Sequence, residues 1–109
     1  MRTPLPIAPE PRFDLPAPDV AGAVAAAALL ADPIRAGILR LLRDGPLCVC
    51  EMAAALGARE NNVSNHLARL REAGLVRAGR HLADGRFLYY ERDEAAVADA
   101  RRALDDVLR

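Results

Sequence analysis

Residues 47–76 read LCVCEMAAALGARENNVSNHLARLREAGLV, and the periodicity of this stretch decides the fold. Val63, Leu67 and Leu70 recur at i, i+4 and i+7, which is the spacing of one face of a helix. Gly74 follows them and is expected to end this helix, because glycine readily adopts the left-handed conformation found at helix C-termini. The stretch therefore predicts a helix with a polar outer face, preceded by a shorter helix and a tight turn.

The limits of these two helices follow from residue types that commonly begin and end helices. The shorter helix is expected over residues 47–56, with Gly57 at its end. Asn61 or Asn62 is expected to cap the longer helix, because an asparagine side chain accepts a hydrogen bond from the amides of the first turn. Together the two form a helix-turn-helix.

Two further helices are predicted upstream. Asp19 is expected to cap a first, alanine-rich helix that runs to about Ala31, and this helix is narrow enough to pack closely against another helix or a second subunit. Its predicted apolar stripe comprises Val20, Val24, Ala27 and Leu30. Asp32 precedes Pro33, which places a capping side chain before a proline at the first position of a second helix.

Strands and a last helix are predicted downstream. Strand-like runs at 75–77 and 86–91 flank the hairpin-turn signal Ala83-Asp84-Gly85. The last helix is expected from about Glu94, and its apolar stripe comprises Val97, Ala100, Leu104 and Val107 or Leu108. A recognition helix followed directly by a hairpin is the layout of a winged helix-turn-helix.

The chain of 109 residues fits one small domain, whose modest core favours association with a second subunit. Residues 1–18 hold six of the eight prolines and are expected to form an extended arm. We predict a mainly α fold with a two-stranded β-wing, a dimeric winged helix-turn-helix domain over residues 19–109. No apolar run approaches the roughly 20 residues that span a bilayer, and the first residues lack the apolar core of a secretory signal, so a cytoplasmic protein without membrane contact is expected.

Charge and the outer face of the longer helix indicate double-stranded DNA as the partner. The net charge is zero, but residues 35–92 carry ten Arg against six acidic residues, and the segments on either side are acidic. Asparagine pairs bidentately with adenine, arginine with guanine, and serine with either base or phosphate. The candidate DNA-contacting residues are Asn61, Asn62, Ser64, Asn65, His66, Arg69 and, in the wing, Arg80 and Arg86. His66 lies nearer the inner face and is either a packing or a phosphate-contacting residue.

Two other interpretations of this surface remain open. A polar helix face can simply be solvated, and a winged helix can bind another protein in place of DNA. An enzymatic interpretation would make Cys48 or Cys50 a redox nucleophile assisted by His66 or His81, but the sequence holds no phosphate-binding loop or catalytic motif to support it. The protein is therefore expected not to be an enzyme.

The region from Asp32 to Tyr90 resembles the ArsR/SmtB family of metal- and metalloid-responsive repressors. The resemblance is carried by DPIRAGILRLL at 32–42, LCVCEMAAALG at 47–57, NNVSNHLARLREAGLV at 61–76 and GRFLYYE at 85–91. It implies a homodimer built on the first and last helices, which binds operator DNA and releases it when a metal or metalloid binds. The Cys-Val-Cys at the start of the helix-turn-helix is its most specific element.

Cys48 and Cys50 are the candidate ligands of the inducing ion. Within a regular helix, residues two apart point about 200° away from each other, so the thiols can converge only if this segment is extended or frayed. Thiolates select soft ions, which favours As(III) or Sb(III) and leaves Cd(II) or Pb(II) possible, whereas Zn(II) would need further ligands.

The chain departs from the fuller patterns of the family. It has no third cysteine. Some members carry one in the arm or soon after the Cys-Val-Cys, but this arm has Glu10 and Asp14 and position 53 is Ala. The last helix also lacks the histidines of the family's zinc site. Two buried structural cysteines, or a redox switch through a strained Cys48–Cys50 disulfide, are the alternatives to an ion sensor.

Overall fold

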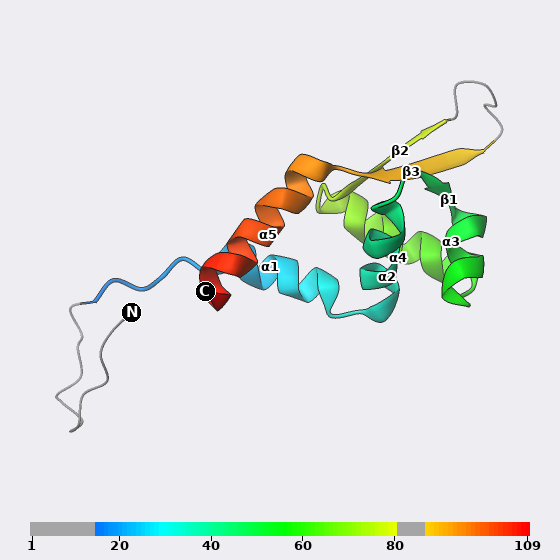
Figure 1. Ribbon diagram of the computed structural model, residues 1–109. Coiled ribbons are helices and arrows are strands. Elements are labelled where there is room, and N and C mark those ends of the chain that lie inside the picture. The colour runs from blue at the N-terminus through cyan, green and yellow to red at the C-terminus, as the bar shows by residue number, and fades with distance from the viewer. Residues whose placement is uncertain (1–14, 81–86) are drawn as a thin grey trace.

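The computed structural model describes residues 15–80 and 87–109, which form five helices and three short strands (Figure 1). In chain order they are α1 (Ala21–Leu30), α2 (Pro33–Leu42), β1 (Leu47–Cys48), α3 (Val49–Leu56), α4 (Glu60–Glu72), β2 (Val76–Arg80), β3 (Leu88–Arg92) and α5 (Glu94–Leu108). The winged helix-turn-helix prediction is confirmed: α3 and α4 are the helix pair, and β2 and β3 form the wing.

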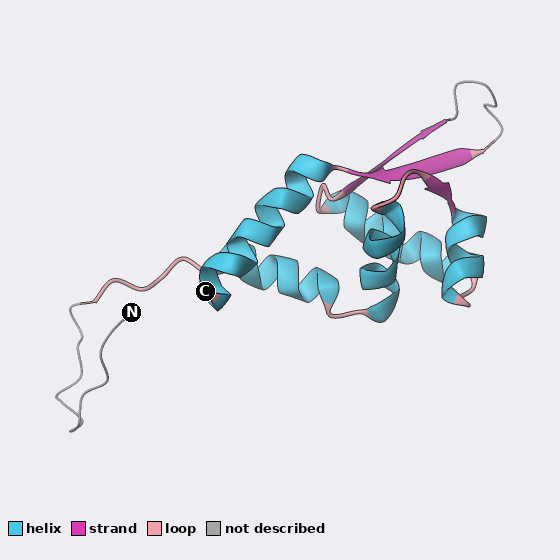
Figure 2. Cartoon of the chain, in the orientation of Figure 1, coloured by secondary structure: helices cyan, strands magenta, loops and turns pink. Residues whose placement is uncertain are grey.

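The sheet has three strands, one more than predicted. β3 is the central strand and pairs antiparallel with both neighbours, in the order β1-β3-β2. The additional strand is Leu47–Cys48, which was expected to be the first turn of the shorter helix. Leu47 lies opposite Tyr90 and Cys48 opposite Tyr89, so pairing with the wing keeps this segment extended and delays the start of α3 to Val49. Figure 2 shows the strands together on one side of the helices.

Capping residues explain where α2 and α5 begin and where α3 ends. Asp32 Oδ1 accepts hydrogen bonds from the amides of Ile34 and Arg35 at 2.8 and 3.2 Å, as expected for the cap of α2. Asp93 caps α5 in the same way, through a 3.0 Å bond from the amide of Ala96. Gly57 ends α3 with φ of 61°, a left-handed conformation that glycine adopts without strain.

Two predicted helix starts were wrong. α4 begins at Glu60, and its N-cap Arg59 makes no side-chain capping bond. Asn61 and Asn62 therefore lie inside the first turn and do not cap the helix. α1 begins at Ala21, and Asp19 accepts a 3.2 Å hydrogen bond from the Ala21 amide although Val20 occupies the N-cap position.

The core lies between α2, α3, α4 and the sheet. The largest fully buried side chains are Ile38, Met52, Val63, Leu67 and Leu70. The predicted inner face of the recognition helix is thus confirmed. Tyr90 of β3 and Val76 of β2 join the same cluster, which fastens the wing to the helix pair.

α1 and α5 form a separate pair at one end of the molecule (Figure 1). Their contact uses small residues: Ala23 and Ala26 are buried, and an added Cβ at Gly22 would lie 3.5 Å from that of Ala103. The predicted stripe of α1 is not buried in the single chain, since Val24 is 60% and Leu30 42% exposed. The last helix runs Glu94–Leu108, close to the prediction, and none of its residues is fully buried.

Among the described residues, no single helix is long and apolar enough to cross a bilayer. α1 and α2 meet such a criterion only as a pair, by length and composition, and they are bent by 95° at their junction.

Candidate functional site

The outer face of α4 presents polar side chains to solvent. Val63 and Leu67 are buried beneath it, with exposed fractions of 0% and 1%, so the orientation of this helix about its axis is fixed by the core. Asparagines, a serine and an arginine face outward along its length. The exposed candidate residues are Asn61, Asn62, Ser64, Asn65 and Arg69. They form a continuous polar surface of the kind that reads base edges and phosphates in a major groove.

The wing contributes fewer residues that the structure describes. Arg77 is paired within the protein: its Nε lies 2.8 Å from Glu91 Oε1 and its Nη1 3.5 Å from Asp93 Oδ2. The hydrogen bond to Glu91 raises the pKa of the Arg77 guanidinium further above its usual value. Arg80 ends β2 opposite Leu88, while the predicted contact Arg86, His81 and the turn at 83–85 lie outside the described residues.

His66 is oriented differently from its neighbours on α4. Its side chain is only 19% exposed and lies against the start of α2. Nδ1 is 3.1 Å from Arg35 Nη1, and Nε2 is 3.6 Å from Asp32 Oδ1. Burial opposes ionisation of Asp32, yet the capping amides of Arg35 and Ile34 together with the nearby His66 and Arg35 side chains lower the pKa of this carboxyl.

The thiol pair lies where β1 meets α3. Cys48 is the N-cap of α3 with extended dihedral angles, φ −85° and ψ 167°, and Cys50 is the second residue of the helix. The rule that residues two apart diverge in a helix therefore does not apply to this pair, and the Cys50 side chain is one of the groups that raise the pKa of Cys48. Cys48 is buried and Cys50 is exposed, so the site is approached from the Cys50 side.

The surroundings of Cys48 hold its thiol in the protonated form. Burial, the neighbouring Cys50 thiol and the Glu51 carboxylate raise the pKa of Cys48 to about 11. Glu51 Oε1 accepts a 3.1 Å hydrogen bond from the Cys48 amide, and this bond lowers the pKa of the glutamate. The acid three residues after the N-cap follows the capping-box pattern, a signal in the sequence that could have located the start of α3.

The donor set fits a soft ion of low coordination number. Sulfur ligands favour soft ions, and an ion held by these two thiols would keep its remaining positions for ligands of its own. Within residues 15–80 and 87–109, no group of three or more His, Cys, Asp or Glu side chains is arranged to hold a metal. A hard or tetrahedral ion that needs four protein ligands from one protomer is not matched by these residues.

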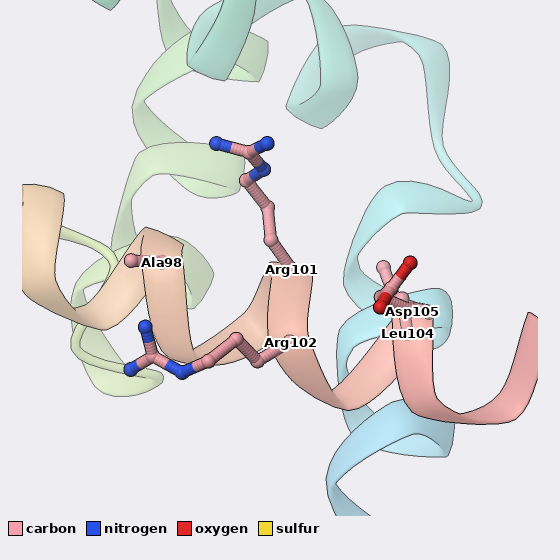
Figure 3. Close-up of a pocket in the computed structure, with 5 residues that line it drawn as sticks. All are labelled: Ala98, Arg101, Arg102, Leu104 and Asp105. Carbon is pink, nitrogen blue, oxygen red and sulfur yellow. The ribbon is translucent and has the colours of Figure 1, made fainter. Parts of the chain in front are cut away.

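The surface of α5 offers no alternative metal centre in the described chain. A hollow of about 640 Å³ on this helix is lined by Ala98, Arg101, Arg102, Leu104 and Asp105. Figure 3 shows the two arginine side chains extending from α5 in different directions, with Asp105 a turn further along. Two cations and one carboxylate repel a metal cation more than they attract it.

The chain is similar in sequence and fold to known proteins. Residues 32–78 match the model of the family described as "Bacterial regulatory protein, arsR family". The chain is 37% identical over 82 residues to the "Arsenical resistance operon repressor" of Escherichia coli K12, a match that covers 74% of the chain and 68% of that protein. The chain belongs to the ArsR family. Its members are DNA-binding transcriptional regulators and not enzymes.

Two more relatives of this ArsR-family protein carry arsenic in their names. "Arsenic resistance transcriptional regulator ArsR1" of Pseudomonas putida KT2440 is 45% identical over 62 residues, which are 56% of the chain and 46% of that regulator. The crystal structure of a "Possible transcriptional regulator for arsenical resistance" superposes with a TM-score of 0.68 at 34% identity, covering 77% of the chain and 84% of that structure. Regulators of this family bind operator DNA and usually act as dimers.

Proposed function

We propose that this protein is a homodimeric repressor that binds operator DNA through α4 and the wing and releases it when As(III) or Sb(III) binds Cys48 and Cys50. The observation that carries the proposal is the position of Cys48, which is at once a residue of β1 and the N-cap of α3. A ligand that draws the two thiols together acts on the strand joined to the wing and on the helix packed against α4.

The route from the thiols to the DNA-reading surface is short. Cys48 lies opposite Tyr89 in the sheet, and β3 continues from there into the wing. On the other side, Met52 and Ala53 of α3 lie in the same buried cluster as Val63 and Leu67 of α4. Because packed interiors do not deform freely, a changed start of α3 is passed on to the recognition helix. A coupling free energy of about 1–3 kcal/mol would weaken operator binding roughly 5- to 150-fold.

The dimer is proposed to form through α1 and α5. Val24 and Leu30 of α1 and its N-cap residue Val20 are 40–60% exposed, and Leu108 at the end of α5 is 81% exposed. Apolar side chains gathered on a helix pair that contributes little to the core are typical of an interface. A two-fold axis beside this pair would present two copies of α4 to half-sites about one DNA turn apart.

The protons released on binding distinguish the trivalent metalloids from divalent ions. Arsenous acid is neutral, and its exchange of two hydroxyl groups for two thiols releases two water molecules and no protons. A divalent ion such as Cd(II) must instead displace at least the Cys48 proton, because the pKa of this thiol is raised to about 11. The affinity for Cd(II) should therefore rise at least about 10-fold per pH unit, whereas that for As(III) should change little between pH 6 and 8.

The experiment is fluorescence anisotropy of the reduced protein on its own promoter DNA, titrated separately with As(III), Sb(III), Cd(II), Pb(II) and Zn(II) at pH 6, 7 and 8. Cys48→Ser and Cys50→Ser are measured beside the wild type, and Ala55→Ser, an exposed position of α3, is the matched control. As(III) and Sb(III) should release the wild type and the control without pH dependence, and release neither cysteine variant.

Other outcomes would decide against the proposal. Release that is steeply dependent on pH and specific to Cd(II) or Pb(II) would identify a divalent-metal sensor. Release by oxidant alone, reversed by a phosphine reductant, would identify a thiol-redox regulator. Wild-type protein that stays on DNA with every ion and oxidant would make the thiol pair structural.

A further inference from the structure

Arg35 joins three elements of the fold through one guanidinium group. It lies in the first turn of α2, where its Nε donates a 2.7 Å hydrogen bond to the carbonyl of Leu29 and its Nη2 a 3.1 Å bond to that of Ala28. These carbonyls belong to the last turn of α1, whose partial negative charge favours a cation. The remaining nitrogen, Nη1, lies 3.1 Å from Nδ1 of His66 on the recognition helix α4.

The chemistry of the pair fixes the proton on His66. A guanidinium has donors and no acceptor, so Nδ1 of His66 must accept from Arg35 and the ring proton must be on Nε2. Nε2 faces Asp32 Oδ1 at 3.6 Å, the same oxygen that caps α2. Both ring nitrogens are therefore directed at the start of α2, within the protein, and not at the solvent in front of α4.

We propose that Arg35 and His66 are positioning residues, which set the angle of the recognition helix relative to α1 and thereby determine operator affinity without contacting DNA. This inference rests on the proposed function of α4 as the DNA-reading helix. α1 packs against α5, so the Arg35–His66 contact is a direct polar connection between the α1/α5 pair and the recognition helix. It assigns to His66 a role different from that of Asn65 or Arg69.

The test uses two substitutions of His66 that have nearly the same shape but differ in polarity. In His66→Asn, the amide oxygen can take the place of Nδ1 and accept from Arg35, whereas His66→Leu fills similar space with no acceptor. Operator affinity is measured by anisotropy at several salt concentrations, and folding is checked by thermal unfolding. His66→Leu should bind about 5- to 30-fold more weakly, and His66→Asn should stay within about 3-fold of the wild type.

Salt dependence separates positioning from contact. Loss of a phosphate contact reduces the magnitude of the slope of log K for operator binding against log salt concentration by about one. Loss of a positioning residue lowers the affinity and leaves this slope unchanged. Arg35→Met should weaken binding as His66→Leu does. Because both residues act through one contact, adding His66→Leu to Arg35→Met should weaken binding by less than His66→Leu does in the wild type. Should His66→Leu fail to fold, Arg35→Lys, which keeps the charge but cannot reach all three partners, takes its place in the comparison.

The outcomes are distinguishable. Unchanged affinity in His66→Leu, or a slope reduced by one, would overturn the positioning role while operator binding by the wild type stands. No binding by the wild type, or full affinity in Asn65→Ala and Arg69→Ala, would overturn the proposed function itself and this inference with it. Weaker binding in His66→Leu at constant slope, rescued by His66→Asn, supports both.

Discussion

The helix-turn-helix with its sheet and the α1/α5 pair differ in how far they bury large apolar side chains. In the first region, five large side chains from α2, α3 and α4 are fully buried. In the second, α1 buries only Ala23 and Ala26, and α5 buries no residue fully. The first region buries its large apolar side chains within the single chain, whereas the second leaves its larger apolar side chains exposed. The difference supports the proposal that DNA binding and dimerisation belong to separate parts of this small protein.

The largest effect is expected where the first region is densest. Leu67→Ala removes a buried side chain of α4 and leaves a cavity, so it should lower the free energy of unfolding by about 2–5 kcal/mol. Chemical denaturation followed by circular dichroism measures this loss. Ala68→Gly, next to it on the exposed side of α4, is the control and should cost about 1 kcal/mol. A smaller loss for Leu67→Ala than for the control would break the contrast between the regions.

The second region is tested by a charge on its exposed stripe. Val24→Asp should weaken self-association about 100-fold or more, because a carboxylate would be buried without a partner in the proposed interface. Sedimentation equilibrium measures the dimer dissociation constant, and thermal unfolding at low concentration shows whether the single-chain fold persists. Ala54→Asp on the exposed side of α3 controls for charge alone and should leave association unchanged. Equal association of both variants would show that α1 is not in the interface.

The two thiols allow a buried and an exposed position of the same region to be compared, because Cys48 is buried and Cys50 is exposed. With its pKa raised to about 11, Cys48 has about 100-fold less thiolate at neutral pH than a thiol of ordinary pKa. Cys50 should therefore be alkylated first by iodoacetamide, as followed by fragment-ion mass spectrometry of the peptide that contains both. In guanidinium chloride the two rates should converge; unequal rates there would attribute the difference to local sequence.

The smallest effect is expected at the junction of the two regions. Asp32→Ala removes the cap of α2 and should lower Tm by about 4–8 °C at neutral pH. Because the pKa of Asp32 is lowered in the folded protein, its contribution is complete above the unfolded value of about 3.8 and is lost as the pH falls through the folded value. Thermal scans of both proteins from pH 3 to 7 should therefore converge at the acidic end. Asp32→Asn, which still accepts a bond from the amides, should recover most of Tm at neutral pH.

Periodicity and capping predicted the parts of the fold that local chemistry controls. The inner face of α4 and the approximate start of α5 follow from the spacing of apolar residues, and the start of α2 follows from Asp32. β1 was missed because a two-residue strand has no periodicity, and its conformation is set by pairing with residues about 40 positions away. The buried face of α1 was missed because contact with α5 selects its small side chains, leaving the larger ones exposed.

The candidate site could be anticipated in its members but not in its geometry. The sequence pointed to the polar residues of α4 and to the Cys-Val-Cys. Whether the thiols diverge or meet depended on the extended conformation of Cys48, which tertiary pairing and Glu51 impose. The sequence placed His66 nearer the inner face, but its contact with Arg35, which lies 31 residues away in the sequence, could not be anticipated.

The shared position of Cys48 has a consequence for biosensor engineering. Strand pairing with Tyr89 uses backbone atoms, so the side chain at this position can be exchanged without removing the pairing that holds the segment extended. The space around it admits only small side chains, since Cys48 is buried, but position 50 opens to solvent and tolerates larger donors. If the proposed function holds, a library that varies residue 50 alone would change which ion triggers the protein without altering any residue of α4.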